Sequence, residues 1–228
     1  MTWHATGVLA ATDPWIRWDW ISRHGDDITA ALREHVYLTV VAMAAGLVIS
    51  FAVALVARRW RWLQTPLLGF SGLLYTIPSL ALFAFLLPIT GLSRSTALIG
   101  LTSYTLLILT RNIIAGLDGV PADVLEAATG MGYGSTRRLV RIELPLALPT
   151  IMAGIRIATV TTIGLVTVAA LIGQGALGAL IKEGIERPFR TPLVVGSVLS
   201  IALAIVADVA LALLLRVLTP WTRKRAAP

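Results

Sequence analysis

Long apolar runs alternate with short polar segments along most of this chain. Each run is almost free of charged residues and holds roughly 22–28 residues. A helix rises about 1.5 Å per residue, so a run of this length crosses the roughly 30 Å hydrocarbon layer of a bilayer. The pattern predicts five transmembrane helices, at residues 36–57, 66–89, 96–117, 147–172 and 191–218.

Polar segments flank these runs at both ends of the chain. Residues 1–35 precede the first run and hold the tryptophans Trp3, Trp15, Trp18 and Trp20. Indole side chains favour the membrane–water interface, so we expect a surface-lying segment here. Stacking of a substrate on these tryptophans is the less favoured alternative. A short basic tail, residues 219–228, follows the last run.

Basic residues cluster at the ends of the apolar runs, and this placement predicts orientation. Arginine and lysine mark the cytoplasmic ends of membrane helices. Five spans place every cluster on one side if the N-terminus lies outside and the C-terminus inside, with residues 118–146 as a cytoplasmic loop. The clusters are Arg58, Arg59 and Arg61, then Arg137, Arg138 and Arg141, then Arg223, Lys224 and Arg225.

Composition supports a helical membrane protein and argues against several other classes. The 228 residues are 57% hydrophobic and 14% charged, and the mean hydropathy is +0.82. In a soluble protein the net charge of +7 would suggest nucleic acid, but here the basic residues set topology and no nucleic-acid partner is expected. The chain has no cysteine. No metal site is expected, because His4, His24 and His35 lack acidic partners at helical spacing.

No catalytic constellation is apparent in the sequence. A phosphate-binding loop would need a lysine after a glycine-rich turn, and the only lysines are Lys182 and Lys224, outside such a context. The sequence holds no Ser/His/Asp set in a credible arrangement. We therefore expect a protein that is not an enzyme.

The most polar interruption between apolar runs is Glu126–Pro145, read as EAATGMGYGSTRRLVRIELP. Pro121 suits the first turn of a helix, and the residues that follow favour helix. Three glycines, Gly130, Gly132 and Gly134, then allow a sharp turn, before a second short helix that leads to Pro145. The stretch predicts a short helix–turn–helix outside the bilayer with small residues on one side.

The spacing EAA-x3-G-x9-I-x-LP resembles the signature loop of permease subunits of ATP-binding-cassette (ABC) importers. The resemblance implies an all-α integral membrane protein with the type I ABC importer (MetI-like) permease fold. It also implies that the loop is a coupling helix that docks on a cytoplasmic ATPase; an ordinary interfacial helix is the alternative. The residues concerned are Glu126, Ala127, Ala128, Thr129, Gly130, Met131, Gly132, Tyr133, Gly134, Ile142, Leu144 and Pro145.

Further segments look like the osmoprotectant permeases, the OpuC-like or ProW-like group that imports glycine betaine, carnitine, choline or proline. They are residues 77–81, 110–112, 143–149, 153–156 and 170–173. This resemblance implies two cytoplasmic ATPases that bind ATP-Mg, while this chain holds no cofactor. It also implies an extracytoplasmic binding protein, a second permease copy or paralogue, and a place in the bacterial plasma membrane.

Two ionisable residues lie well inside apolar runs. Arg156 in the fourth run and Asp208 in the fifth lie at a similar depth, about 12–15 Å from the same side by helical rise. Ionisable residues inside a membrane are usually paired. We expect an ion pair that is either a structural clasp or part of gating.

The second run carries a proline within its apolar core. Tyr75, Pro78 and Ser79 mark this position, where a broken helix could line a pathway or merely form a packing kink.

Three other functions remain open. The chain could be an ABC permease for another small solute, such as an amino acid. It could be an ion-coupled secondary transporter, although no inverted repeat is apparent. It could also be a structural scaffold for a partner membrane protein.

Overall fold

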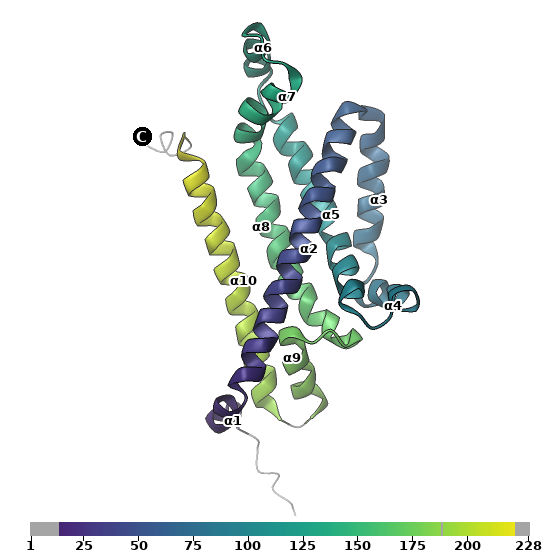
Figure 1. Ribbon diagram of the computed structural model, residues 1–228, viewed down its shortest axis with the longest axis vertical. Helices are drawn as coiled ribbons and strands as arrows, with labels where there is room; N and C mark the ends of the chain where they lie inside the picture. The colour runs from purple at the N-terminus through teal and green to yellow at the C-terminus, as the bar shows by residue number, and fades with distance from the viewer. Residues whose placement is uncertain (1–13, 188, 222–228) are drawn as a thin grey trace, which may run out of the picture.

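The computed structural model of the protein describes residues 14–187 and 189–221, which fold into a bundle of long helices (Figure 1). Trp3, His4 and the basic cluster of the tail lie outside the described residues. Short 3-10 turns occupy Arg61–Leu63 and Ala170–Ile172, and a π-turn occupies Leu139–Glu143. The α-helices are α1 (Trp18–Arg23), α2 (Gly25–Arg59), α3 (Gln64–Thr76), α4 (Ser79–Thr90), α5 (Arg94–Asp118), α6 (Ala122–Gly130), α7 (Ser135–Arg138), α8 (Leu144–Ala169), α9 (Ala176–Glu186) and α10 (Arg190–Leu218).

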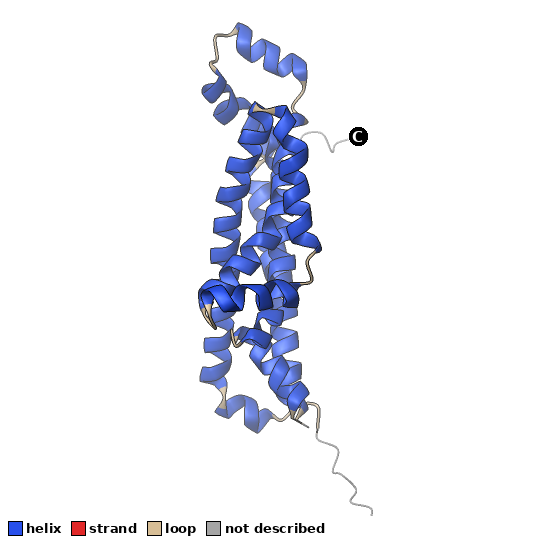
Figure 2. Ribbon diagram, turned by 90° about the vertical axis from the view of Figure 1, so that its right-hand side faces the viewer, coloured by secondary structure: helices blue, strands red, loops and turns tan. Residues whose placement is uncertain are grey.

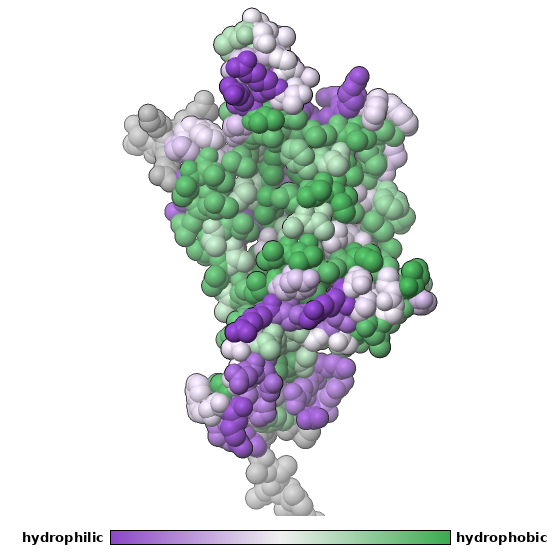
Figure 3. Space-filling view, viewed as in Figure 1, coloured by the Kyte–Doolittle hydropathy of each residue, from purple (hydrophilic) through white to green (hydrophobic). Residues whose placement is uncertain are grey.

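Four continuous helices are long and apolar enough to cross a membrane: α2, α5, the helix Ser135–Ile172 that contains α8, and α10. The bent pair formed by α3 and α4 makes a fifth span if it is counted as one. A broad apolar band covers the middle of the bundle, with hydrophilic residues at both ends (Figure 3). The prediction of an all-α membrane protein with about five spans is confirmed.

The second predicted span, residues 66–89, is not one straight helix. It breaks at Ile77 and Pro78, and the two halves are bent by 96°. Proline disfavours a helical residue before it, and Ile77 is accordingly extended, with φ −64° and ψ 127°. The phenolic hydroxyl of Tyr104 on α5 donates to the Ile77 carbonyl, which the break leaves without a helical partner. Figure 2 shows α4 lying across the bundle.

The first long helix starts eleven residues before the predicted span, at Gly25 rather than at residue 36. The predicted polar segment 1–35 therefore includes the first turns of α2. His35, counted with that segment, is fully buried, and its Nε2 lies 3.0 Å from the Ile163 carbonyl oxygen of α8. Packing against α8 and α9 keeps these turns helical although they carry charged side chains.

The connection between the fourth and fifth predicted spans, residues 173–190, also contains a helix, which the apolar pattern did not indicate. Gly173 adopts a left-handed conformation with φ 77°, which ends the preceding helix. The chain then returns as α9, an 11-residue helix packed against α2, α8 and α10. Together, α1, α9 and the start of α2 form the end of the bundle opposite α6 (Figure 1).

The core lies where α2, α5 and α8 meet. One buried cluster includes Leu38, Phe83 and Leu101, and a second includes Leu109 and Ile113. Gly154 lets α8 approach α5 closely, because a Cβ at this position would lie 2.4 Å from Cβ of Asn112. Small residues at such crossings are the usual way in which membrane helices pack tightly. By contrast, α10 contacts mainly α8 and α9, and none of its most apolar 18-residue window is buried.

Candidate functional site

The segment Glu126–Pro145 projects beyond the bundle at the end where α10 also finishes (Figures 1 and 2). Helix α6 holds Glu126–Gly130, and the chain then turns through Met131–Gly134 into α7. The predicted helix–turn–helix is therefore present. We refer to residues 122–143 as the projecting loop.

The turn after α6 is a Schellman motif, which explains the spacing between its alanines and its glycine. The Tyr133 N–H donates to the Ala128 carbonyl over 3.1 Å, and the Gly132 N–H donates to the Thr129 carbonyl over 2.9 Å. Gly132 has φ 79°, a conformation that L side chains rarely adopt. Because the motif fixes this residue four positions after Ala128, the x3 spacing of EAA-x3-G has a direct geometric cause.

One side of the projecting loop is open. A Cβ placed on Gly130, Gly132 or Gly134 would meet no atom of the described chain within 4 Å. Met131 is 67% exposed. Glu126 is also exposed, and it makes no ion pair with any other described residue. A cavity of about 350 Å³ lies along this side, between Glu126, Gly130 and Arg138. Small residues, an exposed methionine and a free carboxylate form a surface that another protein can approach closely.

The second half of the loop does not stop at Pro145, where the sequence suggested that a short helix ends. The helix instead continues from Ser135 to Ile172, through Pro145 and Pro149. The π-turn at Leu139–Glu143 lies directly before Pro145. The wider π-turn has room for a residue that lacks an N–H, so no break is needed. The second half of the projecting loop, from Ser135 onward, and α8 therefore form one continuous rod.

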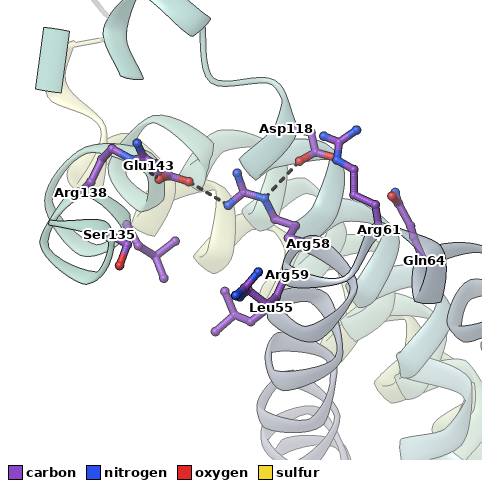
Figure 4. A pocket seen from close by; sticks show the side chains of 10 residues that line it. Leu55, Arg58, Arg59, Arg61, Gln64, Asp118, Ser135, Arg138 and Glu143 are labelled. Atoms are coloured by element: carbon purple, nitrogen blue, oxygen red, sulfur yellow. Dashed lines mark hydrogen bonds and ion pairs between the residues drawn. The ribbon is translucent and has the colours of Figure 1, made fainter. Parts of the chain in front are cut away.

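A buried carboxylate ties the loop to the bundle. Glu143 has a side chain only 4% exposed, and it accepts from Arg58 Nη1 at 2.8 Å and from Arg138 Nε at 3.0 Å. Arg58 also donates to Asp118 Oδ1 at 3.1 Å, and Arg138 donates to the Thr129 hydroxyl at 3.0 Å. Figure 4 shows Arg58 lying between the two carboxylates. We call Arg58, Asp118, Thr129, Arg138 and Glu143 the ion-pair node.

The node connects five elements: the end of α2, the end of α5, helix α6, the end of α7 and the π-turn before α8. Arg138 and Glu143 are five residues apart, and a π-turn, with its i to i+5 pairing, brings such residues to one face. Charge-assisted bonds to a buried carboxylate are among the stronger polar contacts. The ion-pair node therefore fixes the position of the projecting loop relative to α2 and α5.

The sequence pattern alone did not indicate this node. In the sequence, Arg58 and Arg138 stand out only as markers of topology, and Glu143 only as the variable position of I-x-LP. The neighbouring positions face elsewhere: Leu144 packs against the apolar core, while Ile142 and Pro145 line a cavity of about 300 Å³ together with Val124 of α6. The available signal was an acidic residue, Glu143, next to a basic cluster at the edge of an apolar run.

Arg156 on α8 and Asp208 on α10 form a two-pronged ion pair. Arg156 Nε lies 2.8 Å from Asp208 Oδ1, and Nη2 lies 2.7 Å from Oδ2. Both side chains are about one-third exposed, and they line a cavity of about 470 Å³ between the two helices. The pair therefore links α10 to α8 beside this cavity.

Tyr75, Pro78 and Ser79 all lie at the bend between α3 and α4. Tyr75 is 38% exposed, and its ring meets that of Tyr104 edge to face, with centroids 5.9 Å apart. Pro78 is exposed, and Ser79 is the first residue of α4. In the described part of the chain, no group of three or more His, Asp or Glu side chains is arranged to hold a metal ion.

Comparison with known proteins gives a consistent result. Residues 38–222 match the model of the family described as binding-protein-dependent transport system inner membrane component. The osmoprotectant import permease protein OsmW of Salmonella typhimurium is 38% identical over 82% of this chain and 89% of its own length. The glycine betaine/carnitine/choline transport system permease protein OpuCB of Bacillus subtilis is 32% identical over 88% of this chain and 92% of its own.

Solved structures with the same fold include a chain of the MetNI methionine ABC transporter. It superposes with a TM-score of 0.75 at 20% identity, over 84% of this chain and 96% of that one. A chain from an amino acid ABC transporter gives 0.71 at 16% identity, over 88% of this chain and 98% of that one. These matches establish the fold.

Proposed function

The chain belongs to the family of binding-protein-dependent transport system inner membrane components, and from this premise we propose that it is the permease subunit of an ATP-driven importer of compatible solutes. The observation that carries the proposal is the projecting loop, which is open on one side and fixed by the ion-pair node on the other. Such a loop suits the transmission of force from a partner to the membrane helices.

We assign the open side of the loop to contact with a cytoplasmic ATPase, which binds ATP-Mg and hydrolyses it. The glycines at 130, 132 and 134 allow close approach, and Glu126 is free to pair with a basic side chain. Because Ser135–Ile172 is one helix, a displacement of the loop carries α8 with it. The node transmits the same displacement to the ends of α2 and α5.

Movement of the rod then reaches α10 through Arg156 and Asp208. These side chains form an ion pair between α8 and α10 within the apolar runs. Alternating access follows if the ATPases close on ATP, draw the loops together and open the pathway outward. In this arrangement the N-terminus lies outside, and the projecting loop and the C-terminus lie inside, as the basic clusters predict.

The pathway requires a second permease copy or paralogue, because four or five spans are too few to enclose it. We therefore propose two permease subunits with one ATPase on each projecting loop. An extracytoplasmic binding protein would deliver the solute to the end that carries α1 and α9. The bend at Tyr75, Pro78 and Ser79 is the proposed pathway-lining element, since broken helices commonly line transport sites.

Glycine betaine, carnitine, choline or proline is the proposed solute class. The names of OsmW and OpuCB support it, since they describe import of osmoprotectants and of glycine betaine, carnitine and choline. Tight recognition of a quaternary ammonium uses a cage of several aromatic rings. At the bend, the aromatic pair is Tyr75 with Tyr104. Recognition by the binding protein, followed by weak contacts in the permease, fits this sparse aromatic content.

The test is ATP hydrolysis in liposomes that contain the permease with an ATPase and a binding protein from the same source. The binding protein is loaded in turn with glycine betaine, carnitine, choline, proline, methionine and histidine. We expect at least one of the first four solutes to stimulate hydrolysis and to be taken up in labelled form. We expect neither effect with methionine or histidine.

Other results would change the assignment. Stimulation by methionine or histidine would keep the importer and move the solute class to amino acids. Uptake that continues without ATP but follows an ion gradient would contradict the proposal in favour of a secondary transporter.

A further inference from the structure

The turn between α2 and α3 combines arginines with exposed tryptophans. Residues 58–62 read Arg-Arg-Trp-Arg-Trp, and Trp60 and Trp62 are 49% and 75% exposed. Tryptophan prefers the headgroup level of a bilayer, where its ring is in apolar surroundings and its N–H is hydrated. The turn therefore lies at the membrane surface, at the same end of the bundle as the projecting loop (Figure 1).

A cavity of about 330 Å³ opens beside this turn, between it and the π-turn at the base of the projecting loop (Figure 4). This size lies at the lower end of the range of roughly 300–1,000 Å³ for small-molecule sites. Four arginines line the cavity, against two carboxylates, those of Asp118 and Glu143. The lining thus carries an excess of positive charge.

The two carboxylates do not neutralise all four arginines. Arg58 and Arg138 make the ion pairs with Asp118 and Glu143 that form the node. Arg59 and Arg61 are exposed, and neither side chain has an acidic or hydrogen-bonding partner among residues 14–187 and 189–221. Two guanidinium groups therefore face the same cavity with their charge uncompensated.

The rest of the lining supplies neutral donors and an apolar wall. Gln64 at the start of α3 and Ser135 at the start of α7 provide an amide and a hydroxyl. Leu55 and Leu139 line the cavity as well, and Leu55 lies one turn further into α2, toward the apolar band. A ligand that fits this lining has a charged oxygen-rich group next to an apolar chain.

We propose that this cavity is a binding site for an anionic phospholipid, whose phosphate pairs with Arg59 and Arg61 while its acyl chain leaves past Leu55. Guanidinium groups match the geometry of phosphate oxygens and pair with them in a two-pronged manner. Basic pockets between membrane helices at the cytoplasmic surface are known places for anionic lipid headgroups.

Free phosphate and a partner protein are the competing occupants, and the geometry favours the lipid over both. Free phosphate gains nothing from Leu55 or from the neighbouring tryptophans. The proposed ATPase contact, on α6 and its glycine turn, lies further from the bundle than the turn between α2 and α3 does (Figure 1). A lipid at this position lies directly beside Arg58 and Glu143 and braces the node.

The test is native mass spectrometry of the full-length chain, released from detergent after titration with phosphatidylglycerol, phosphatidylcholine or inorganic phosphate. We expect one tightly retained phosphatidylglycerol per chain, with phosphatidylcholine retained at least about tenfold more weakly, because each basic residue near the surface contributes several-fold. Equal retention of both lipids would overturn the proposal. Displacement of phosphatidylglycerol by millimolar phosphate would also overturn it, in favour of a free-anion site.

Paired variants localise the site. Arg59→Gln with Arg61→Gln removes both free guanidinium groups, and should weaken phosphatidylglycerol retention about tenfold or more. Arg23→Gln with Arg33→Gln removes two charges at the opposite end, and should change nothing. Arg59→Lys with Arg61→Lys keeps the charge and should retain most of the lipid binding. It serves as the second test if Arg59→Gln with Arg61→Gln fails to fold.

Two results with these variants would contradict the lipid site. Unchanged lipid retention in Arg59→Gln with Arg61→Gln would place the lipid elsewhere. Loss of ATPase association in that variant, with lipid retention intact, would make this surface a protein contact instead.

Discussion

Arg58, at the end of α2, donates from Nη1 to Oε2 of Glu143 over 2.8 Å, and so joins two positions that lie 85 residues apart in the chain. The acceptor is almost fully buried, and it also holds Arg138 of the projecting loop. The pair is therefore a mechanical joint between the loop and the first long helix. It makes the loop a rigid extension of the bundle.

Glu143→Gln tests this joint. The amide keeps the shape but loses the negative charge that two arginines share, so the free energy of unfolding should fall by about 1–3 kcal/mol. ATP hydrolysis per solute transported should also rise, because the loop moves with less effect on α2. Both are measured on the purified protein, by denaturant unfolding in mixed micelles and by transport in liposomes.

A surface pair provides the control for Glu143→Gln. Arg94 and Glu34 are joined by two hydrogen bonds of 2.8 and 3.0 Å, but the Arg94 side chain is 65% exposed. Arg94→Gln should change stability by less than about 1 kcal/mol. A similar loss of unfolding free energy in both variants would mean that the burial of Glu143 does not strengthen its ion pairs.

Arg156 and Asp208 should depend on each other. An unpaired charge in the middle of a membrane helix costs about 2.5–3.5 kcal/mol, so Arg156→Met or Asp208→Leu alone should lower stability or folded yield strongly. The double variant should recover most of the loss, because both charges are gone. A thermal unfolding series of the four proteins measures this, and a double variant as poor as the sum of the singles would refute the coupling.

Recovered stability need not mean recovered transport. If the pair is only a clasp, the double variant should transport at nearly the normal rate. If the pair carries movement from α8 to α10, the double variant should fold well but transport slowly. The same four proteins in the uptake assay separate these roles.

Gly134→Trp should block docking of the ATPase without damaging the permease. Gly134 has φ −67° and ψ 161°, which any residue adopts, and its Cβ direction is empty. The indole should therefore leave stability unchanged within about 0.5 kcal/mol, while it prevents close approach of a partner. Co-purification with the ATPase measures docking, and Gly25→Trp, which is equally open but at the opposite end, is the control.

At Gly132 the turn requires a particular backbone conformation. Its φ of 79° favours glycine, and asparagine is the residue that best tolerates this region. Gly132→Asn should keep the turn and most of the ATPase binding, whereas Gly132→Val should disrupt both. Equal behaviour of the two variants in co-purification would show that the Schellman turn is unimportant for docking.

Tyr104→Phe should loosen the bend between α3 and α4. Its hydroxyl satisfies the part-buried Ile77 carbonyl, and loss of a typical hydrogen bond costs about 0.5–1.5 kcal/mol. We expect faster amide hydrogen exchange in α4, with α8 unchanged as the internal reference. Exchange that is the same in both proteins would mean that Pro78 alone fixes the bend.

Much of this protein is determined by local sequence. Apolar runs of sufficient length predict membrane helices, because an α-helix forms all of its backbone hydrogen bonds within one segment, as the hydrocarbon layer requires. The Schellman turn is local as well, since its two hydrogen bonds join Tyr133 to Ala128 and Gly132 to Thr129. The similar depth of Arg156 and Asp208 follows from counting residues along two helices, once both helices are recognised.

The sequence marks a possible break at Pro78, but only the tertiary structure decided how sharply the helix bends and where other helices continue or begin early. The hydroxyl that satisfies the Ile77 carbonyl comes from Tyr104 on α5, the early start of α2 accompanies the packing of His35 on α8, and the rod through Pro145 follows a π-turn. The ion-pair node is the clearest case. Its members come from positions 58, 118, 129, 138 and 143. No local pattern predicts which arginine reaches Glu143, because the choice depends on where three helix ends meet in space.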